Sequence, residues 1–330
     1  MTRTTRVRRA AVALTFVFAL AAPVAAQQEA EFENLKILPK NISRPELLSI
    51  MGGFTRALGV RCGYCHVSEQ ENPTAKNRFA LDDKPQKAKA RIMMTMTHDL
   101  NEKYLTQLAT REKPAIDVQC VTCHHGVSEP RQLQDILTQK YEEGGVDSTL
   151  ARYRTLRERY YGRASYDFGE LPLAEAGTNL LKSGHGDDGV QLLAYNVEMN
   201  PKSAFAKRQH AAIAILNAYQ TQGKDAGAAK YREMLALYSK DVVSEELLND
   251  VGYRLIDAGQ IGPAVAAFEL NVSEHPQSSN AYDSVGEGYV KLHQRKQAIA
   301  AFNKALALDA GNKDAQHWLD ELKRDPKLGK

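Results

Sequence analysis

Apolar residues recur at helical spacing through most of this sequence, which predicts a mainly α-helical fold. In the stretch after residue 43 they share one helix face: Leu47, Ile50, Met51, Phe54 and Leu58. Ser43-Arg-Pro45-Glu46 has the form of a capping box with proline in the first turn, and Gly59 is suited to a helix end. We therefore expect a helix over residues 43–59 with Met51 on its apolar face.

A second amphipathic stretch lies between residues 83 and 104. Asp83-Lys-Pro85-Gln86 resembles a helix start, and one face of the helix that follows carries Met93, Met96, Leu100 and Tyr104. Met94 and His98 lie off that face. This stretch is therefore expected to form a second helix that carries methionines, as the first one does.

The C-terminal half has an internal period of 34 residues, the length of a tetratricopeptide repeat. Residues 250–276 and 284–310 align at this offset, and the identities include Gly252 with Gly286 and Phe268 with Phe302. The small residues let paired helices approach, and the aromatic residues fill the gap between them. A generic helical bundle is the alternative, and the regular offset argues against it.

Weaker copies of the repeat precede these two. One is marked by Gly177, Leu180, Leu193 and Pro201, and a longer, irregular one covers residues 203–240. Residues after Asn312 are expected to form a terminal helix that covers the last repeat. Residues 170–330 are thus predicted to form a helical tetratricopeptide-like solenoid, after a helical connector over residues 133–169. Its histidines are expected to be exposed: His185, His210, His275, His293 and His317.

The first 26 residues predict a secretory signal peptide. Four arginines precede an apolar run over residues 10–22, and Val24-Ala25-Ala26 supplies small residues for cleavage. The run is too short to span a bilayer comfortably. We therefore expect a periplasmic or otherwise exported chain that has no retained transmembrane segment and is at most peripheral to a membrane.

Composition and charge change this picture little. The chain has 330 residues, of which 43% are hydrophobic and 25% charged, as in an ordinary globular protein. Removing residues 1–26 takes away four arginines and no acidic residue, so the formal net charge falls from +3 to −1. No basic stripe remains, so nucleic acid is not an expected partner.

All four cysteines lie in two C-x-x-C-H motifs, Cys62-Gly-Tyr-Cys65-His66 and Cys120-Val-Thr-Cys123-His124. In such a motif both thiols bond to the porphyrin of a c-type haem, and the adjacent histidine is the proximal iron ligand. A four-cysteine zinc site is disfavoured by the histidine after each pair and by the separation of 58 residues. A thioredoxin-like pair lacks its strand-turn-helix context. The sequence therefore predicts two covalently bound haem c groups.

Methionines on the two amphipathic helices are candidates for the distal iron ligands. Met51 lies on the apolar face of the helix that leads directly to Cys62, and the alternative is that it only fills core space. For the second haem, helical spacing alone does not choose between Met93 and Met96.

Residues 43–132 resemble half of the tetrahaem cytochrome subunit bound to photosynthetic reaction centres of purple bacteria. Besides the first C-x-x-C-H motif, the resemblance is carried by Leu-Leu-Ser-Ile-Met51, Met93-Met-Thr-Met96-Thr-His-Asp-Leu-Asn101 and Cys120-Val-Thr-Cys-His-His-Gly-Val-Ser-Glu-Pro130. In that family a helix bearing a distal methionine precedes most of the haem motifs, so the resemblance assigns Met51 to the first haem. For the second haem it favours Met93, with Met96, Met94 and His98 as alternatives. Only two of the family's four haems have a counterpart here.

Two haems with histidine and methionine ligands suit the relay of single electrons between redox proteins, because methionine raises the potential and saturates the iron. The predicted order is a signal peptide (1–26), a di-haem cytochrome c domain (27–132), the connector and the repeats. Such repeats resemble modules that dock a protein partner or a second subunit. The alternative is a di-haem peroxidase-like enzyme or a haem-based sensor with one open haem. No acid-base pair is identifiable, which favours an electron carrier.

Overall fold

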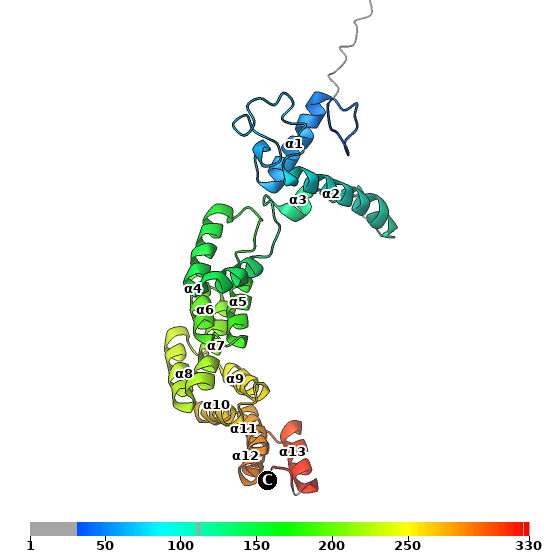
Figure 1. Ribbon diagram of the computed structural model, residues 1–330. Helices are drawn as coiled ribbons and strands as arrows, with labels where there is room; N and C mark the ends of the chain where they lie inside the picture. Colours follow the sequence, from blue (N-terminus) through cyan, green and yellow to red (C-terminus); the bar gives the residue numbers. More distant parts are fainter. Residues whose placement is uncertain (1–31, 111–112, 326, 330) are drawn as a thin grey trace, which may run out of the picture. The chain divides into compact units, whose positions relative to one another are not determined.

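The computed structural model describes residues 32–110, 113–325 and 327–329, and every regular element in these ranges is a helix (Figure 1). The prediction of a mainly α-helical fold is confirmed. The predicted signal peptide lies outside the described residues. The described residues divide into two compact units: an N-terminal unit within residues 32–56 and 60–120, and a second unit within residues 57–59 and 121–329.

Helix α1 (Arg44–Leu58) has the predicted start and end. The Ser43 hydroxyl accepts a hydrogen bond from the Glu46 backbone N–H at 3.4 Å, and Gly59 follows the helix with a φ of 64°. The Gly126 N–H donates to the Ala57 carbonyl at 2.9 Å, and a Cβ on Gly59 would overlap the Gly126 carbonyl. Glycine at position 59 is therefore needed both for its backbone conformation and for this close approach.

Helix α2 (Pro85–Asp99) begins at the predicted proline, but its N-cap residue is Lys84, without a side-chain cap. The predicted helix start over residues 83–86 is therefore confirmed. The helix continues into a π-helical turn, η2 (Leu100–Tyr104), and a short 3₁₀ turn, η3 (Leu105–Gln107). The Thr97 hydroxyl donates to the carbonyls of Met93 and Met94 at 3.1 and 3.0 Å, just before the α-helix changes to the π-helical turn.

Helix α4 (Leu133–Tyr160) fills most of the predicted connector and is kinked at Gly144 and Gly145, a feature absent from the prediction. Gly145 has a φ of 71° and a ψ of −169°, which ends one helical segment and starts the next. The apolar side chains of α4 form one core with α5 (Glu170–Lys182) and α6 (Gly186–Met199), and Tyr153 is fully buried in it. The connector is thus packed as a layer on the first repeat.

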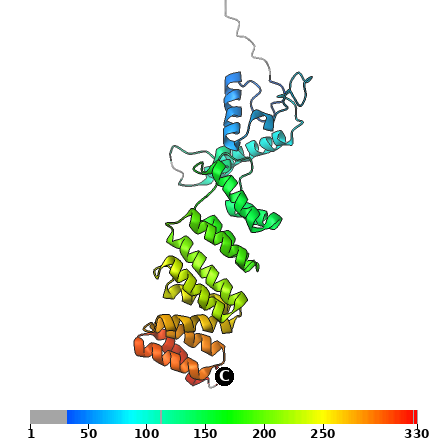
Figure 2. The ribbon, with the colours of Figure 1, turned by 90° about the vertical axis from the view of Figure 1, so that its left-hand side faces the viewer.

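The remaining helices form pairs that follow one another along the chain (Figure 2): α7 (Ala204–Gln222) with α8 (Lys224–Tyr238), α9 (Glu245–Asp257) with α10 (Ile261–Glu274), and α11 (Ser279–Lys291) with α12 (Arg295–Leu308). Helix α13 (Lys313–Arg324) covers the last pair, where Leu319 and Leu322 pack with Phe302. The predicted helical repeats and terminal helix are confirmed. No helix within the described residues is long and apolar enough to cross a membrane.

The repeat register is visible in matched contacts between paired helices. A Cβ on Gly252 would clash with the ring of Phe268, and a Cβ on Gly286 would lie 2.6 Å from the ring of Phe302. Both phenylalanines are fully buried. These two pairs of identities at the 34-residue offset are therefore positions where paired helices touch.

Gly286→Ala is expected to destabilise the repeats by about 2–3 kcal/mol, because the added methyl forces Phe302 from its packed position. The matched control is Gly262→Ala in α10, where a Cβ would meet no atom within 4 Å. That variant is expected to gain about 0.5–1 kcal/mol from the reduced freedom of the unfolded chain. Urea unfolding followed by circular dichroism measures both, and equal stabilities of the two variants would contradict the packing argument.

His210 departs from the expectation that the C-terminal histidines are exposed. It is 6% exposed on α7, a helix that is buried nearly all round, and its Nδ1 lies 2.5 Å from the Tyr238 hydroxyl. Burial, with the nearby charge of Lys230, lowers the pKa of His210 to about 4, against an opposing effect of Glu233. The imidazole is therefore neutral in the folded protein at neutral pH.

This shift makes the repeats sensitive to acid. As the pH falls, His210 is protonated in the unfolded chain before it is protonated in the folded one. The contribution of the neutral imidazole to the free energy of unfolding is therefore complete above pH 6.5 and is lost as the pH falls to about 4. The free energy of unfolding is expected to fall by about 3 kcal/mol over this pH range. The His210→Phe variant is expected not to show this fall. Unfolding free energies measured at pH 7 and pH 4.5 test this, with His317→Phe as the exposed control. An unchanged pH profile in His210→Phe would contradict it.

Candidate haem-binding sites

The first C-x-x-C-H motif lies on a short 3₁₀ turn, η1 (Cys62–Tyr64). The backbone N–H groups of Cys65 and His66 both donate to the Cys62 carbonyl, at 3.2 and 3.0 Å, which brings the two cysteines and the histidine onto one turn. The His66 Nδ1 lies 3.0 Å from the Phe79 carbonyl oxygen. That hydrogen bond uses Nδ1 as the donor and leaves Nε2 as the nitrogen for iron.

A polar network from α2 fixes the chain that supplies this carbonyl. The Lys87 ammonium donates to the carbonyls of Phe79, Ala80 and Leu81 at 2.8–2.9 Å. Asp82 accepts from Arg91 at 2.9 Å, and with the help of this contact its pKa is held far below its usual range. The loop after the first motif is therefore anchored to the helix that carries Met93.

Burial, with the charges of Lys87 and Lys84, lowers the pKa of His66, although the hydrogen bond to Phe79 acts in the opposite direction. The imidazole is therefore neutral at neutral pH, which is the form that ligates a metal. Burial also raises the pKa of the Cys65 thiol, against the charges of the same lysines. Cys65 is thus expected to be a protonated thiol before thioether formation.

The second motif forms the short helix α3 (Cys120–His124). The His124 Nδ1 lies 2.9 Å from the Val127 carbonyl oxygen, so its Nε2 is again left for iron. His125 has a φ of 45° and is exposed, and its carbonyl accepts the Ser165 hydroxyl at 2.6 Å. The two motifs thus place their histidines through the same kind of backbone contact, which motif spacing did not reveal.

The candidate distal ligands differ in solvent exposure. Met51 and Met94 are half-buried, whereas Met93 and Met96 are 40% and 42% exposed. His98 is exposed as well. The similar exposure of Met93 and Met96 leaves the choice for the second haem as open as the sequence did, and Met51 and Met93 remain predictions.

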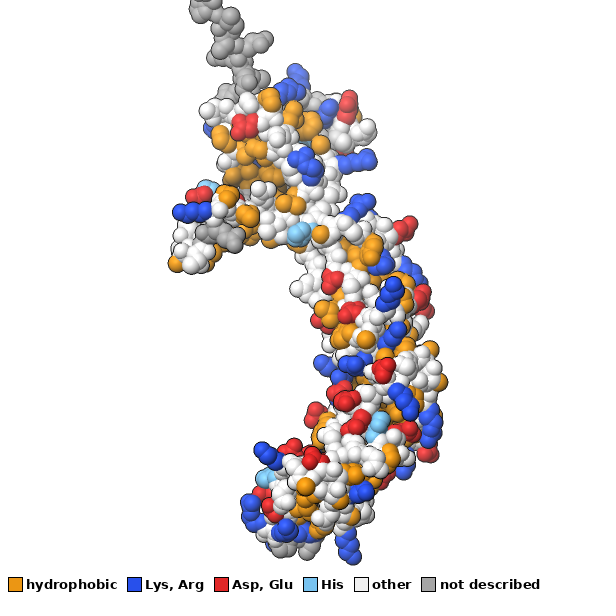
Figure 3. Space-filling model, turned by 180° about the vertical axis from the view of Figure 1, so that it is seen from behind, with side chains coloured by type: hydrophobic (Ala, Val, Ile, Leu, Met, Phe, Trp, Pro, Cys, Tyr) orange, Lys and Arg blue, Asp and Glu red, His pale blue; other side chains and the backbone are white. Residues whose placement is uncertain are grey.

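The surroundings of both motifs fit covalently bound haem. Cys62 and Cys123 are exposed, and Cys65 and Cys120 are half-buried. Figure 3 shows hydrophobic side chains gathered on the surface of the N-terminal unit. Large apolar side chains of this unit that are exposed include Leu48, Phe79, Ile92, Tyr104, Leu108 and Ile116. They supply the apolar surface against which a porphyrin packs. In the described part of the chain no three His, Cys, Asp or Glu side chains are grouped so that they could hold a metal ion.

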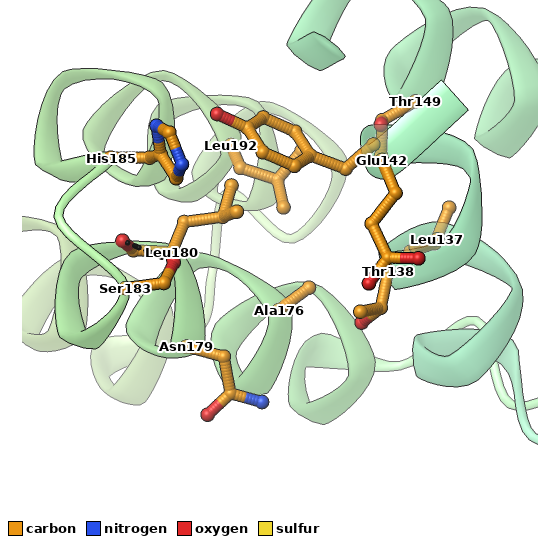
Figure 4. A pocket seen from close by; sticks show the side chains of 11 residues that line it. Leu137, Thr138, Glu142, Thr149, Ala176, Asn179, Leu180, Ser183, His185 and Leu192 are labelled. Carbon is orange, nitrogen blue, oxygen red and sulfur yellow. Dashed lines mark hydrogen bonds between the residues drawn. The ribbon is translucent and has the colours of Figure 1, made fainter. Parts of the chain in front are cut away.

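A pocket of about 310 Å³ lies outside these motifs, between α4 and the first repeat (Figure 4). Glu142, Ser183 and His185 are among its lining residues. The Ser183 hydroxyl donates to the Leu180 carbonyl at 3.0 Å, and the Tyr141 hydroxyl donates to Asp188 at 2.6 Å. The Ser183 and Tyr141 hydroxyls are therefore engaged in hydrogen bonds within the fold.

The fold and the motifs define a cytochrome domain followed by helical repeats. Residues 13–150 match the family model described as the photosynthetic reaction centre cytochrome C subunit. The resemblance predicted from the motifs is thus confirmed for the N-terminal part of the chain, and it supports covalently bound haem.

Relatives match each part separately. Cytochrome c-554 of Chloroflexus aurantiacus is 39% identical over 69 residues, which are 21% of this chain and 14% of that protein. The chloroplastic tetratricopeptide repeat domain-containing protein PYG7 of Arabidopsis thaliana is 29% identical over 85 residues, 26% of this chain and 28% of that protein. The matches therefore span less than a third of either relative. A crystal structure of MamA aligns with 53% of this chain and 95% of MamA, at 22% identity and a TM-score of 0.27.

Proposed function

We propose that this protein is an exported di-haem c-type cytochrome that relays single electrons between redox protein partners. The observation that carries the proposal is the repeated arrangement of the two motifs. Each has two cysteines followed by a histidine whose Nδ1 is bonded to a backbone carbonyl, at Phe79 and at Val127. The family match over residues 13–150 supports the same class.

The chain's own residues then have distinct roles. Cys62, Cys65, Cys120 and Cys123 hold the porphyrins, His66 and His124 are the proximal ligands, and Met51 and Met93 are the proposed distal ligands. A haem held in this way supplies a one-electron carrier, and a sixth ligand from methionine raises its potential and closes the iron to substrates. The repeats are proposed to dock a partner or a second subunit, and residues 1–26 to direct export to the periplasm.

A peroxidase-like enzyme or a haem-based sensor is the second candidate. It is favoured by the environment of the candidate distal ligands. Met93 and Met96 are similarly exposed, and their helix continues as a π-helical turn from Leu100. Such turns are frequent at functional sites. This candidate requires an open distal position at the second haem.

A potentiometric titration of the purified holoprotein with and without carbon monoxide separates the two functions. The electron relay predicts two one-electron steps and no change in the spectrum of the reduced protein on adding carbon monoxide. Binding of carbon monoxide to one ferrous haem would overturn the relay and support the enzyme or sensor.

A further inference from the structure

An acidic recess, made by Asp283, Glu287 and Asp314, lies where the first helices of successive repeats meet. Asp283 and Glu287 are one turn apart on α11, and Asp314 is in the first turn of α13. Helix α11 contacts both α9 and α13. Figure 3 shows acidic side chains gathered on the hollowed face of the repeats.

Asp283 is the innermost member of the recess. It is only 6% exposed, and its Oδ1 has no hydrogen-bond partner among the described residues. Asn249, which precedes Asp283 by one 34-residue period on α9, also has a buried and unpartnered side-chain oxygen. Leaving such an acceptor unpaired costs about 1–3 kcal/mol, and more when it is charged. The Asp283 Oδ1 is therefore an acceptor that a donor from outside the described chain can satisfy.

The other carboxylates continue outward from Asp283. Glu287 is half-buried and Asp314 is exposed, so the recess opens to solvent. Burial, together with the charges of Glu287 and Asp314, raises the pKa of Asp283 to about 7. Burial also raises the pKa of Glu287, although hydrogen bonds from Trp318 and Tyr253 and the charge of Lys291 oppose this. No Lys or Arg of the described chain forms an ion pair with any of the three carboxylates.

We propose that the acidic recess receives a lysine or arginine side chain of a protein partner. An ammonium or guanidinium group supplies the donor that the Asp283 oxygen lacks, and a charge-assisted hydrogen bond is stronger than a neutral one. An anionic or apolar group would leave the carboxylates uncompensated. A metal ion is disfavoured because no group of His, Cys, Asp and Glu side chains suited to one is found in the described chain. The inference rests on the proposed docking role of the repeats and specifies its partner.

The test uses the full-length holoprotein and a fluorescein-labelled, end-capped peptide of alternating lysine and alanine. Fluorescence anisotropy at low salt is expected to show binding of this peptide and none of the matched glutamate peptide. The double variant Asp283→Asn with Glu287→Gln is expected to bind the lysine peptide at least tenfold more weakly. The matched control, Glu198→Gln with Asp320→Asn, changes the net charge equally at two exposed positions and is expected to bind as the parent does.

A second measurement excludes a purely structural role for the carboxylates. Asp283 and Glu287 repel each other and neither has an ion-pair partner within the described chain, so replacing both is expected to leave the thermal unfolding temperature unchanged or raised. A lowered unfolding temperature, equal peptide binding by both double variants, or binding of the glutamate peptide would overturn the proposal. So would a wild-type dimer that the recess variant converts to monomer, because a second copy would then be the occupant. Haem potentials measured on the same samples report on the electron relay, so the two proposals can fail separately.

Discussion

Alanine at all four cysteines of the C-x-x-C-H motifs is expected to unfold residues 32–132 while the helical repeats stay folded. Helices α2 and α3 and the short turns bury none of their residues, and α1 buries only Ala57. By contrast, α9 alone buries five of its residues, among them Leu248, Val251 and Leu255. Each large apolar side chain covered by a bound porphyrin contributes about 1.5–3 kcal/mol. Without covalent haem the N-terminal unit therefore lacks most of the core that a stable fold needs.

Limited proteolysis with mass spectrometry measures this outcome directly. The variant is expected to be cut within residues 32–132 and to leave a resistant fragment that contains α5–α13, with a cooperative thermal transition of its own. His125→Ala is the control, because this exposed side chain lies beside a motif without belonging to it. A cysteine-free variant that protects its N-terminal unit as the parent does would show that haem is not its core.

Met51→Ala is expected to lower the midpoint potential of one haem by on the order of 0.1 V, within the range of about 0.8 V that axial ligands span. The ferrous form of that haem is also expected to bind carbon monoxide, because its distal position is open. Spectroelectrochemical titration of the variant measures both effects. Met199→Ala in the repeats is the matched control, since Met199 packs against the core between α4 and α6.

The same titration identifies the distal ligand of the second haem when it is applied to a series of alanine variants in α2. Met93→Ala is expected to shift the other haem, whereas Met94→Ala, Met96→Ala and His98→Ala are expected to leave both potentials in place. A shift confined to Met96→Ala would move the ligand by one helical turn and correct the assignment. Unchanged potentials in Met51→Ala would show that this methionine only fills space.

Elements governed by local chemistry could be predicted from the sequence. The cap at Ser43, the end at Gly59 and the 34-residue register all follow from residues close together in the chain, and the structure contains each of them. The kink at Gly144 and Gly145 was missed, because a helical pattern continues on both sides of it. His210 was misplaced because α7 is enclosed by neighbouring helices that its own sequence does not reveal.

The candidate haem sites could likewise be predicted only in part from the sequence. The C-x-x-C-H spacing identifies the cysteines and histidines, since thioether formation and ligation need them in one turn. The carbonyl of Phe79, the anchoring by Lys87 and the close approach of Gly59 to Gly126 depend on contacts distant in sequence. Exposure does not separate Met93 from Met96, so the distal ligand of the second haem remains a prediction.

The number of covalent haems per polypeptide tests the central claim most directly. A pyridine haemochrome spectrum of the denatured protein, referred to the polypeptide concentration, is predicted to give two haems that acidic solvent extraction does not remove. Alanine at Cys62 and Cys65, or at Cys120 and Cys123, is predicted to leave one. A wild-type value of one or none, or haem that the solvent extracts, would contradict the di-haem cytochrome.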